Sequence, residues 1–185
     1  MLPLFGLFLI FHLEEVQVWI PLGEQRNFLY VLTFVSTFFL PLLNALLLLR
    51  LNMIDSLEMK TRQERKIPYL VVSIFYFVEL YFLVKADVPD LILALMVGAT
   101  LVVVSVLLIN LFWQISAHMA GIGGLTGMMI SLSYRLQINL HLILISIFLI
   151  AGLVAFSRLK LSAHSAAEVY GGFLLGAGLQ LVLFL

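Results

Sequence analysis

The sequence predicts an all-α membrane protein, a polytopic bundle of transmembrane helices. Hydrophobic residues make up 63% of the 185-residue chain and charged residues 11%, whereas a soluble domain is about 45–50% apolar and about 25% charged. The mean hydropathy is +1.17. The apolar runs are also much longer than barrel strands of about 10 residues, so they fit helices that satisfy their own backbone hydrogen bonds in lipid.

Six segments are apolar and long enough to cross a membrane, which takes about 20 residues in a helix. These predicted spans are Phe28–Leu49, Pro68–Val84, Asp90–Leu111, Ala117–Tyr134, Ile138–Phe156 and Ser165–Leu185. Short connections join them, apart from the polar stretch Arg50–Ile67. We therefore expect one integral membrane domain over 1–185, with a six-helix core at 28–185.

A shorter apolar segment, MLPLFGLFLIF, precedes this core. It lacks the positive n-region and cleavage site of a secretory signal, and it is about half the length of a span. For residues 1–27 the sequence leaves open an interfacial helix, a re-entrant piece or the tail of a span.

Other features restrict the possible partners and groups. The chain has no cysteine, so a disulfide framework or a thiolate metal site is impossible. Its formal net charge is zero, and it has no basic run with interleaved aromatics, which argues against a nucleic-acid partner. The lipid bilayer is the partner that the composition indicates.

The tripeptide Ser-Ala-His occurs twice, at 116–118 and at 162–164, each time at the start of an apolar run. Counting spans places both copies, and the Arg50–Ile67 loop, on the same side of the membrane. The span count does not depend on the tripeptides, so this agreement is an independent indication that they act together.

The second copy lies in SRLKLSAHSAAE, from Ser157 to Glu168. Glu168 follows His164 by four residues, a spacing that brings two side chains together on one helix face. Its carboxylate would fix the imidazole tautomer and leave the other ring nitrogen as a nucleophile or base. Ser162 suits an N-cap, which would place His164 in the first helical turn, where backbone N–H groups favour an anion.

The first copy repeats this pattern, with Ser116 as a cap and His118 in the first turn. Each histidine is followed by a GxxxG pair, Gly123 and Gly127 or Gly172 and Gly176, and this spacing lets membrane helices approach closely. Packing of the two helices would bring both histidines together. With Arg158 they would form a phosphate site in which one imidazole attacks, the other donates a proton and arginine binds oxygens. Neither a metal nor a cofactor is required.

The stretch SRLKLSAHSAAE resembles the third signature of the type 2 phosphatidate phosphatase (PAP2-like) superfamily, SR-x5-H-x3-D. SAH at 116–118 resembles the second signature, usually SGH, and RKIP at 65–68 resembles part of the first, K-x6-RP. More loosely, KIPYL, HMAGIGGL and GFLLG resemble a bacterial membrane-protein branch of this superfamily. The resemblance implies a six-helix membrane phosphatase that works without metal, in the bacterial cytoplasmic (inner) membrane, on a phosphorylated membrane lipid.

The resemblance also implies residue roles. His164 would be the nucleophile that forms a phosphohistidine, with Glu168 orienting it, and His118 would be the general acid. Phosphate would be bound by residues of all three signatures: Arg158, Ser116, the Ala117 amide and Arg65.

The chain departs from the family pattern at several positions. Glu168 replaces an aspartate, Ala117 replaces a glycine, and Glu58 stands where the first-signature lysine would fall. Lys60, Arg62 or Lys66 would then supply the missing cation, and the sequence does not choose among them. These departures motivate an alternative, a non-catalytic binder or carrier of phosphorylated lipids that keeps the pocket.

Several questions remain open at the sequence level. Lys and Arg are more numerous on the side of the membrane that holds both Ser-Ala-His copies, which favours a cytoplasmic active site. Bacterial members of the superfamily that the chain resembles usually work on the outer face. The lipid and the oligomeric state are not specified. A small transporter is a weaker third hypothesis. Glu79 lies within a predicted span and has no assigned role, while His12 and His141 fit interfacial positions.

Overall fold

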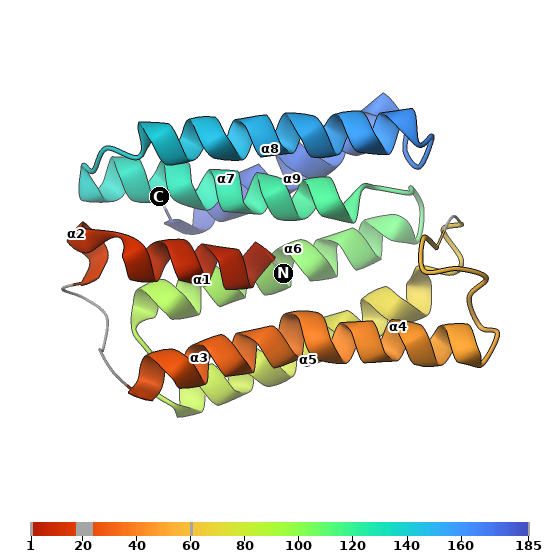
Figure 1. The fold of residues 1–185 in the computed structure, drawn as a ribbon, viewed down its shortest axis with the longest axis horizontal. Coiled ribbons are helices and arrows are strands. Elements are labelled where there is room, and N and C mark those ends of the chain that lie inside the picture. Colours follow the sequence, from red (N-terminus) through yellow and green to blue (C-terminus); the bar gives the residue numbers. More distant parts are fainter. Residues whose placement is uncertain (1, 18–23, 60, 185) are drawn as a thin grey trace. The chain divides into compact units, whose positions relative to one another are not determined.

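A computed structural model describes residues 2–17, 24–59 and 61–184 of the chain (Figure 1). These residues are almost entirely helical, and no strand occurs among them. The helices are α1 (Leu2–His12), α2 (Glu14–Gln17), α3 (Glu24–Phe34), the π-helix η1 (Val35–Phe39), α4 (Leu40–Arg50), α5 (Lys66–Lys85), α6 (Asp90–Asn110), α7 (Ala117–Leu136), α8 (His141–Lys160) and α9 (Ala166–Phe184). The prediction of an all-α fold is thus confirmed for the described part of the chain.

Five of these helical segments are long and apolar enough to cross a membrane. They are Gln25–Arg50, Lys66–Lys85, Asp90–Asn110, His141–Lys160 and Ala166–Phe184. The short apolar helix Leu2–His12 precedes them, as expected. The predicted sixth span, 117–134, forms α7, but α7 is not among these five. Its four glycines carry no apolar side chain and His118 is polar, so the hydropathy of α7 is low even though the helix has 20 residues.

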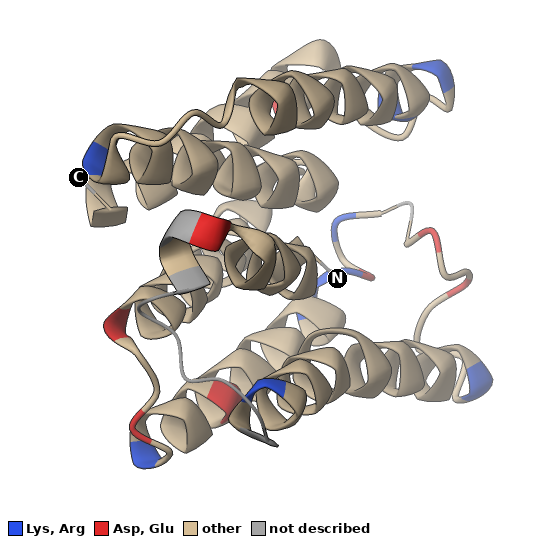
Figure 2. Cartoon of the chain, turned by 60° about the vertical axis from the view of Figure 1, so that its left-hand side comes forward, with Lys and Arg blue, Asp and Glu red and all other residues tan. Residues whose placement is uncertain are grey.

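Large apolar side chains remain exposed along the helices that qualify as spans. Leu142 and Val182 are each 82% exposed, and Leu153 is 69% exposed. Most charged residues lie at helix ends and in the connecting segments (Figure 2). Soluble proteins rarely expose apolar surface on this scale, whereas lipid covers it without cost, so the five helices indicate an integral membrane protein.

The chain divides into two compact units, Met1–Thr100 and Leu101–Leu185. In the first unit, α3, η1 and α4 form one continuous helical segment that packs against α5. Because the loop 51–65 reverses the chain, the two segments run antiparallel. The π-helix ends just before Pro41, which has no N–H for the α-helical hydrogen bond.

In the second unit, α7 is the central helix and α9 lies along it in parallel. Twelve residues of α7 are buried. The register is set by small residues. A side chain at Gly123 would collide with the backbone of Phe173, one at Gly127 with that of Ala177, and one at Gly176 with that of Ala120. This close packing of the GxxxG residues is what places the starts of α7 and α9 beside each other.

Candidate functional site

The start of α7 rests directly on the first turn of α9. The Ser116 N–H donates to the Glu168 carbonyl at 3.2 Å. A Cβ on Gly172 would lie 2.5 Å from the Ser116 carbonyl oxygen, so only glycine allows this approach. The backbone of the first Ser-Ala-His copy is therefore fixed against Glu168, the residue four positions after His164.

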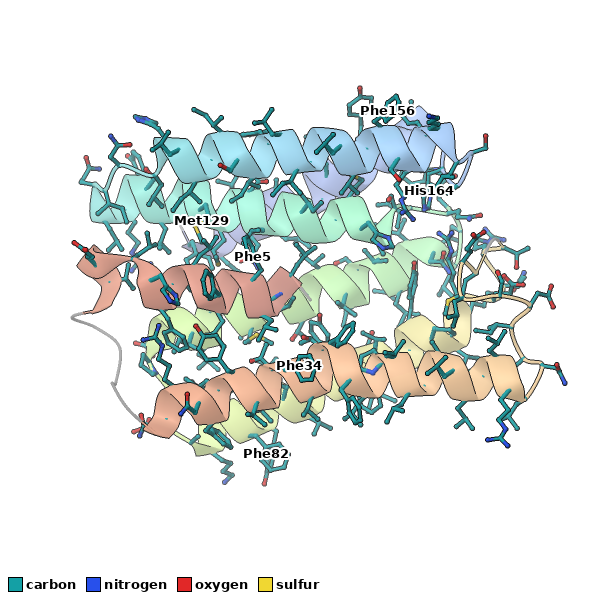
Figure 3. All side chains as sticks on the ribbon, viewed as in Figure 1. Phe5, Phe34, Phe82, Met129, Phe156 and His164 are labelled. Atoms are coloured by element: carbon teal, nitrogen blue, oxygen red, sulfur yellow. The ribbon has the colours of Figure 1, made fainter. Side chains whose placement is uncertain are left out.

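His164 lies at the end of the second unit where α8 finishes and α9 begins (Figure 3). The sequence predicted that His164 lies in the first turn of a helix, but in the structure it precedes that helix. Ser162 has φ 50° and belongs to the turn after α8, and α9 begins only at Ala166. The predicted N-cap at Ser162 is thus wrong, because the chain needs this left-handed residue to reverse direction before α9.

The His164 ring is held by two acceptors on the same nitrogen. Its Nδ1 lies 3.0 Å from Glu168 Oε2 and 3.1 Å from the Gln114 carbonyl oxygen. A carbonyl and a carboxylate can only accept, so Nδ1 must carry the proton. In the neutral ring Nε2 then carries the lone pair. The side chain of His164 is 3% exposed and that of Glu168 17% exposed, which makes this an ordered arrangement at the helix end.

Glu168 is oriented in turn by the cap of α9. The Ser165 N–H donates to Glu168 Oε2 at 3.0 Å, and the Glu168 N–H donates to Ser165 Oγ at 3.4 Å. This reciprocal pair is a capping box, the Ser-x-x-Glu arrangement that satisfies two N–H groups at a helix start. One carboxylate oxygen therefore links the helix cap to the His164 ring.

The first Ser-Ala-His copy occupies the start of α7. Ser116 has extended backbone (φ −80°, ψ 104°) at the N-cap position, but its hydroxyl makes no cap hydrogen bond. Ser116 is completely buried, and its Oγ has no hydrogen-bond partner among the described residues. Ala117 is the first helical residue, so its N–H has no intrahelical acceptor. His118 follows it in the first turn, as predicted, and is exposed.

Arg158 lies in the last turn of α8, and its carbonyl accepts the Ala163 N–H at 3.1 Å. Its Nε is buried and has no partner among the described residues. Ser116 Oγ and Arg158 Nε are thus two buried donors without described acceptors where α7 begins and α8 ends; a third in this unit, Ser131 Oγ, lies much further along α7. Buried polar atoms normally have partners, so this pair is the electrostatic feature that an anion would complete.

Arg65 belongs to the first unit, where it is 6% exposed and its Nε donates to the Met59 carbonyl at 2.7 Å. A second reciprocal pair, between Thr61 and Glu64, orders the loop before it. The Thr61 N–H donates to Glu64 Oε2 at 3.3 Å, and this bond is the main reason why the pKa of Glu64 is lowered. Arg62 and Lys66 are half-buried, Glu58 is exposed, and Lys60 lies outside the described residues. Phosphate binding by Arg65 stays a prediction.

Sequence reasoning missed three contributors to this site. Ser165 was detectable, because SAAE at 165–168 matches the capping-box pattern. Gln114 acts through its backbone carbonyl, for which no side-chain pattern exists. The Trp113 ring lies over Gly171, where an added Cβ would be 2.7 Å from the ring.

No known protein family, no curated protein and no solved structure matches this chain. Within the described residues, His, Cys, Asp and Glu side chains form no group of three that could hold a metal ion. The interpretation of the site therefore depends on its own geometry.

Proposed function

We propose that the protein is a membrane lipid phosphatase of the type 2 phosphatidate phosphatase superfamily, working through a phosphohistidine. The observation that carries this proposal is the His164 ring, whose Nδ1 faces both Glu168 Oε2 and the Gln114 carbonyl. This arrangement leaves Nε2 with the lone pair, as a nucleophile requires.

The proposed reaction has two steps. His164 Nε2 attacks phosphorus, the bond from phosphorus to the leaving oxygen breaks, and His118 donates a proton to that oxygen. Water then attacks phosphorus and gives a proton to His118, the bond from phosphorus to His164 Nε2 breaks, and inorganic phosphate leaves while Nε2 regains its lone pair. Glu168 stabilises the charge that develops on the His164 ring.

Phosphate oxygens would be bound by the donors that lack acceptors, Ser116 Oγ and Arg158 Nε, together with the Ala117 N–H at the start of α7. Preorganised donors in a water-poor site stabilise developing charge strongly. Arg65 would contribute as the first-signature cation.

The proposed substrate is a phosphate or pyrophosphate headgroup on a lipid whose tail stays in the bilayer. His164 lies at the end of two apolar helices, α8 and α9, which are long enough to span a membrane. That is the depth at which a lipid headgroup sits. We propose the bacterial cytoplasmic membrane as the location.

Phosphate release by the purified full-length protein tests this function. A panel of lipid phosphates and pyrophosphates is incubated with EDTA present, and His164→Ala and His118→Ala are compared with His141→Ala, an exposed histidine at the start of α8. We expect release by the native protein and by His141→Ala, none by the other two, and a bell-shaped pH profile, because one histidine acts as a base and the other as an acid. Full activity in His164→Ala would refute the assignment.

A second candidate is a phosphatase-like protein that binds phosphorylated lipids without hydrolysing them. The observation that favours it is the pair of sequence departures, Ala117 and Glu58, which leaves the anion-binding donors but alters the catalytic signatures. This protein would bind lipid phosphate and release no inorganic phosphate. Arg158→Ala would then weaken binding, whereas the native chain would be inactive on every lipid in the panel.

A further inference from the structure

The first unit has an apolar groove that the proposed reaction does not use. The groove has a volume of about 570 Å³ and lies between α1 and α3, where it is lined by Leu4, Phe5, Phe8, Tyr30, Val31 and Phe34. Its α3 side belongs to the membrane span Gln25–Arg50. Val31 is 62% exposed and Phe8 is 45% exposed. The lining side chains are therefore accessible to a ligand that enters from the side of the span.

The groove has a direction, because α1 and α3 run antiparallel (Figure 1). Phe11, in the last turn of α1, packs edge-on against Tyr30, with the two ring centroids 5.2 Å apart. Leu4 and Phe5, near the start of α1, line the groove together with Phe34, the last residue of α3. One end of the groove thus lies near the start of the span, and the other end lies deeper along it.

A positive charge lies at the first of these ends. Arg26 is the second residue of the span Gln25–Arg50. Its guanidinium carbon lies 6.0 Å from the centroid of the Tyr30 ring, which lines the groove, and 5.0 Å from that of Phe11. One of its N–H groups donates to the Phe11 carbonyl at 3.1 Å. A guanidinium has five N–H donors in a fork that suits phosphate, and the end of a span lies at the level of lipid headgroups.

The distance from Arg26 along the groove matches one leaflet of a bilayer. Phe34 follows Arg26 by eight residues, which is about 12 Å along a helix. The Phe38 ring, whose centroid lies 5.4 Å from that of Phe34, continues the apolar surface. One leaflet contributes about 15 Å to a hydrocarbon core of about 30 Å. A lipid with its phosphate at Arg26 would therefore reach these two rings with the end of its acyl chain.

We propose that this groove binds one acyl chain of a phospholipid whose phosphate is held by Arg26. The apolar lining suits the chain, and the phosphate brings a negative charge to a guanidinium whose described contacts are one carbonyl and two rings. A diacylglycerol or an apolar helix would fill the groove but would bring no anion to Arg26. The site lies within the first unit, and it does not rest on the proposed phosphatase function.

A phosphatidylglycerol with a photoreactive diazirine in one acyl chain tests the site in the detergent-solubilised full-length protein. This lipid is a phosphodiester, so it is not a substrate of the proposed phosphatase, and the test is independent of that activity. After illumination, mass spectrometry locates the label. We expect saturable labelling of the groove residues of α1 and α3. Unlabelled phosphatidylglycerol should displace the label at a concentration about fivefold lower than diacylglycerol with the same chains, because one basic residue contributes about that factor.

Two outcomes would overturn the proposal. Label that is equally strong on exposed side chains of α8 and α9, such as Leu153 and Val182, would show ordinary contact with lipid. A groove without label, in a protein that is labelled on α8 and α9, would show that protein closes it.

Matched variants test the two parts of the site separately. Val31→Trp fills the groove from an exposed position and should lower its labelling at least about tenfold. Leu47→Trp, at a position of the same span that is 53% exposed and does not line the groove, should be labelled as the native protein is. Equal labelling of the groove in the two tryptophan variants would refute the acyl-chain site.

Arg26→Gln tests the phosphate contact. It should weaken displacement by phosphatidylglycerol about fivefold and leave displacement by diacylglycerol unchanged. Arg50→Gln, at the other end of the same span, should change neither. Equal losses in the two arginine variants would show a general attraction between lipid and cations, and would refute the role of Arg26.

Discussion

Two glutamates, one in each unit, show opposite ways of placing a carboxylate at or within a membrane. Glu168 Oε2 faces two donors of its own chain, the Ser165 N–H and His164 Nδ1. Glu79 is completely buried, and Thr33 is the described side chain that acts on its carboxylate. Glu168 is a component of a helix cap, whereas Glu79 lies within a helix that can span a membrane.

The difference lies in the donors that each carboxylate meets. Two donors on Glu168 Oε2 fix its direction, so this carboxylate can orient an imidazole. Glu79 lies in the interior of the first unit, where the Thr33 side chain acts on its carboxylate. The same type of side chain thus orients a ring in one unit and is a buried acid in the other.

The sharpest test of this comparison is Glu168→Ala. Loss of the orienting carboxylate should lower kcat by up to about 10⁴-fold, the loss found when the acidic partner of a catalytic histidine is replaced. Glu168→Asp, the residue of the family signature, should recover part of this loss, and the pH profile of kcat should shift in both variants. Phosphate release by Glu79→Gln should equal that of the native protein. An unchanged kcat in Glu168→Ala would mean that Glu168 only caps α9.

The Glu168 environment also depends on the seating of α9 against α7. In Gly176→Ala the added Cβ meets the backbone of Ala120, whereas in Gly178→Ala it meets nothing within 4 Å. We expect Gly176→Ala to lower the free energy of unfolding by about 1–3 kcal/mol, the usual cost of overpacking. Gly178→Ala should be neutral or slightly stabilising, because alanine is the better helix former. Reversible unfolding in mixed micelles measures both, and equal values for the two variants would contradict this packing.

Much of the fold was predictable from the sequence, because long apolar runs leave few alternatives to helices. The predicted 90–111 and 165–185 segments agree with α6 and α9 within a residue or two over the described range. Segment 117–134 was predicted as a sixth span because its length is right. The structure shows α7 as a buried, glycine-rich helix that packs against α8 and α9. Segment length and hydropathy in the sequence do not distinguish a helix buried among other helices from one that faces lipid.

The site was predictable only where side chains follow a local spacing. The i, i+4 rule correctly paired His164 with Glu168, and the GxxxG spacing predicted that the two helix starts meet. The prediction of an N-cap at Ser162 was wrong because more than one nearby serine could cap the helix. Only the tertiary structure reveals that Ser162 has φ 50°. The π-helix was not predicted for a related reason. Pro41 indicates that the helix is irregular nearby, but it does not indicate which hydrogen-bond register the preceding turn adopts.

The cap itself gives a smaller effect. Ser165→Ala removes the hydroxyl that accepts the Glu168 N–H, and loss of an N-cap side chain costs about 1 kcal/mol. Ser162→Ala, at the residue first expected to cap the helix, should change the free energy of unfolding by much less, because Ser162 is exposed and precedes α9 by four residues. Unfolding in mixed micelles compares them directly. A larger loss in Ser162→Ala would restore the original interpretation.

The smallest effect is expected for the stability of Glu79→Gln. Removing one partner of a buried ion pair is strongly destabilising, because it leaves an unpaired charge. Glutamine keeps a side-chain oxygen that can accept from Thr33 and carries no charge, so the free energy of unfolding should change by less than about 1 kcal/mol. Unfolding in mixed micelles measures the difference. A large destabilisation would show that Glu79 is one partner of a buried ion pair in the folded chain, and the contrast with Glu168 would no longer hold.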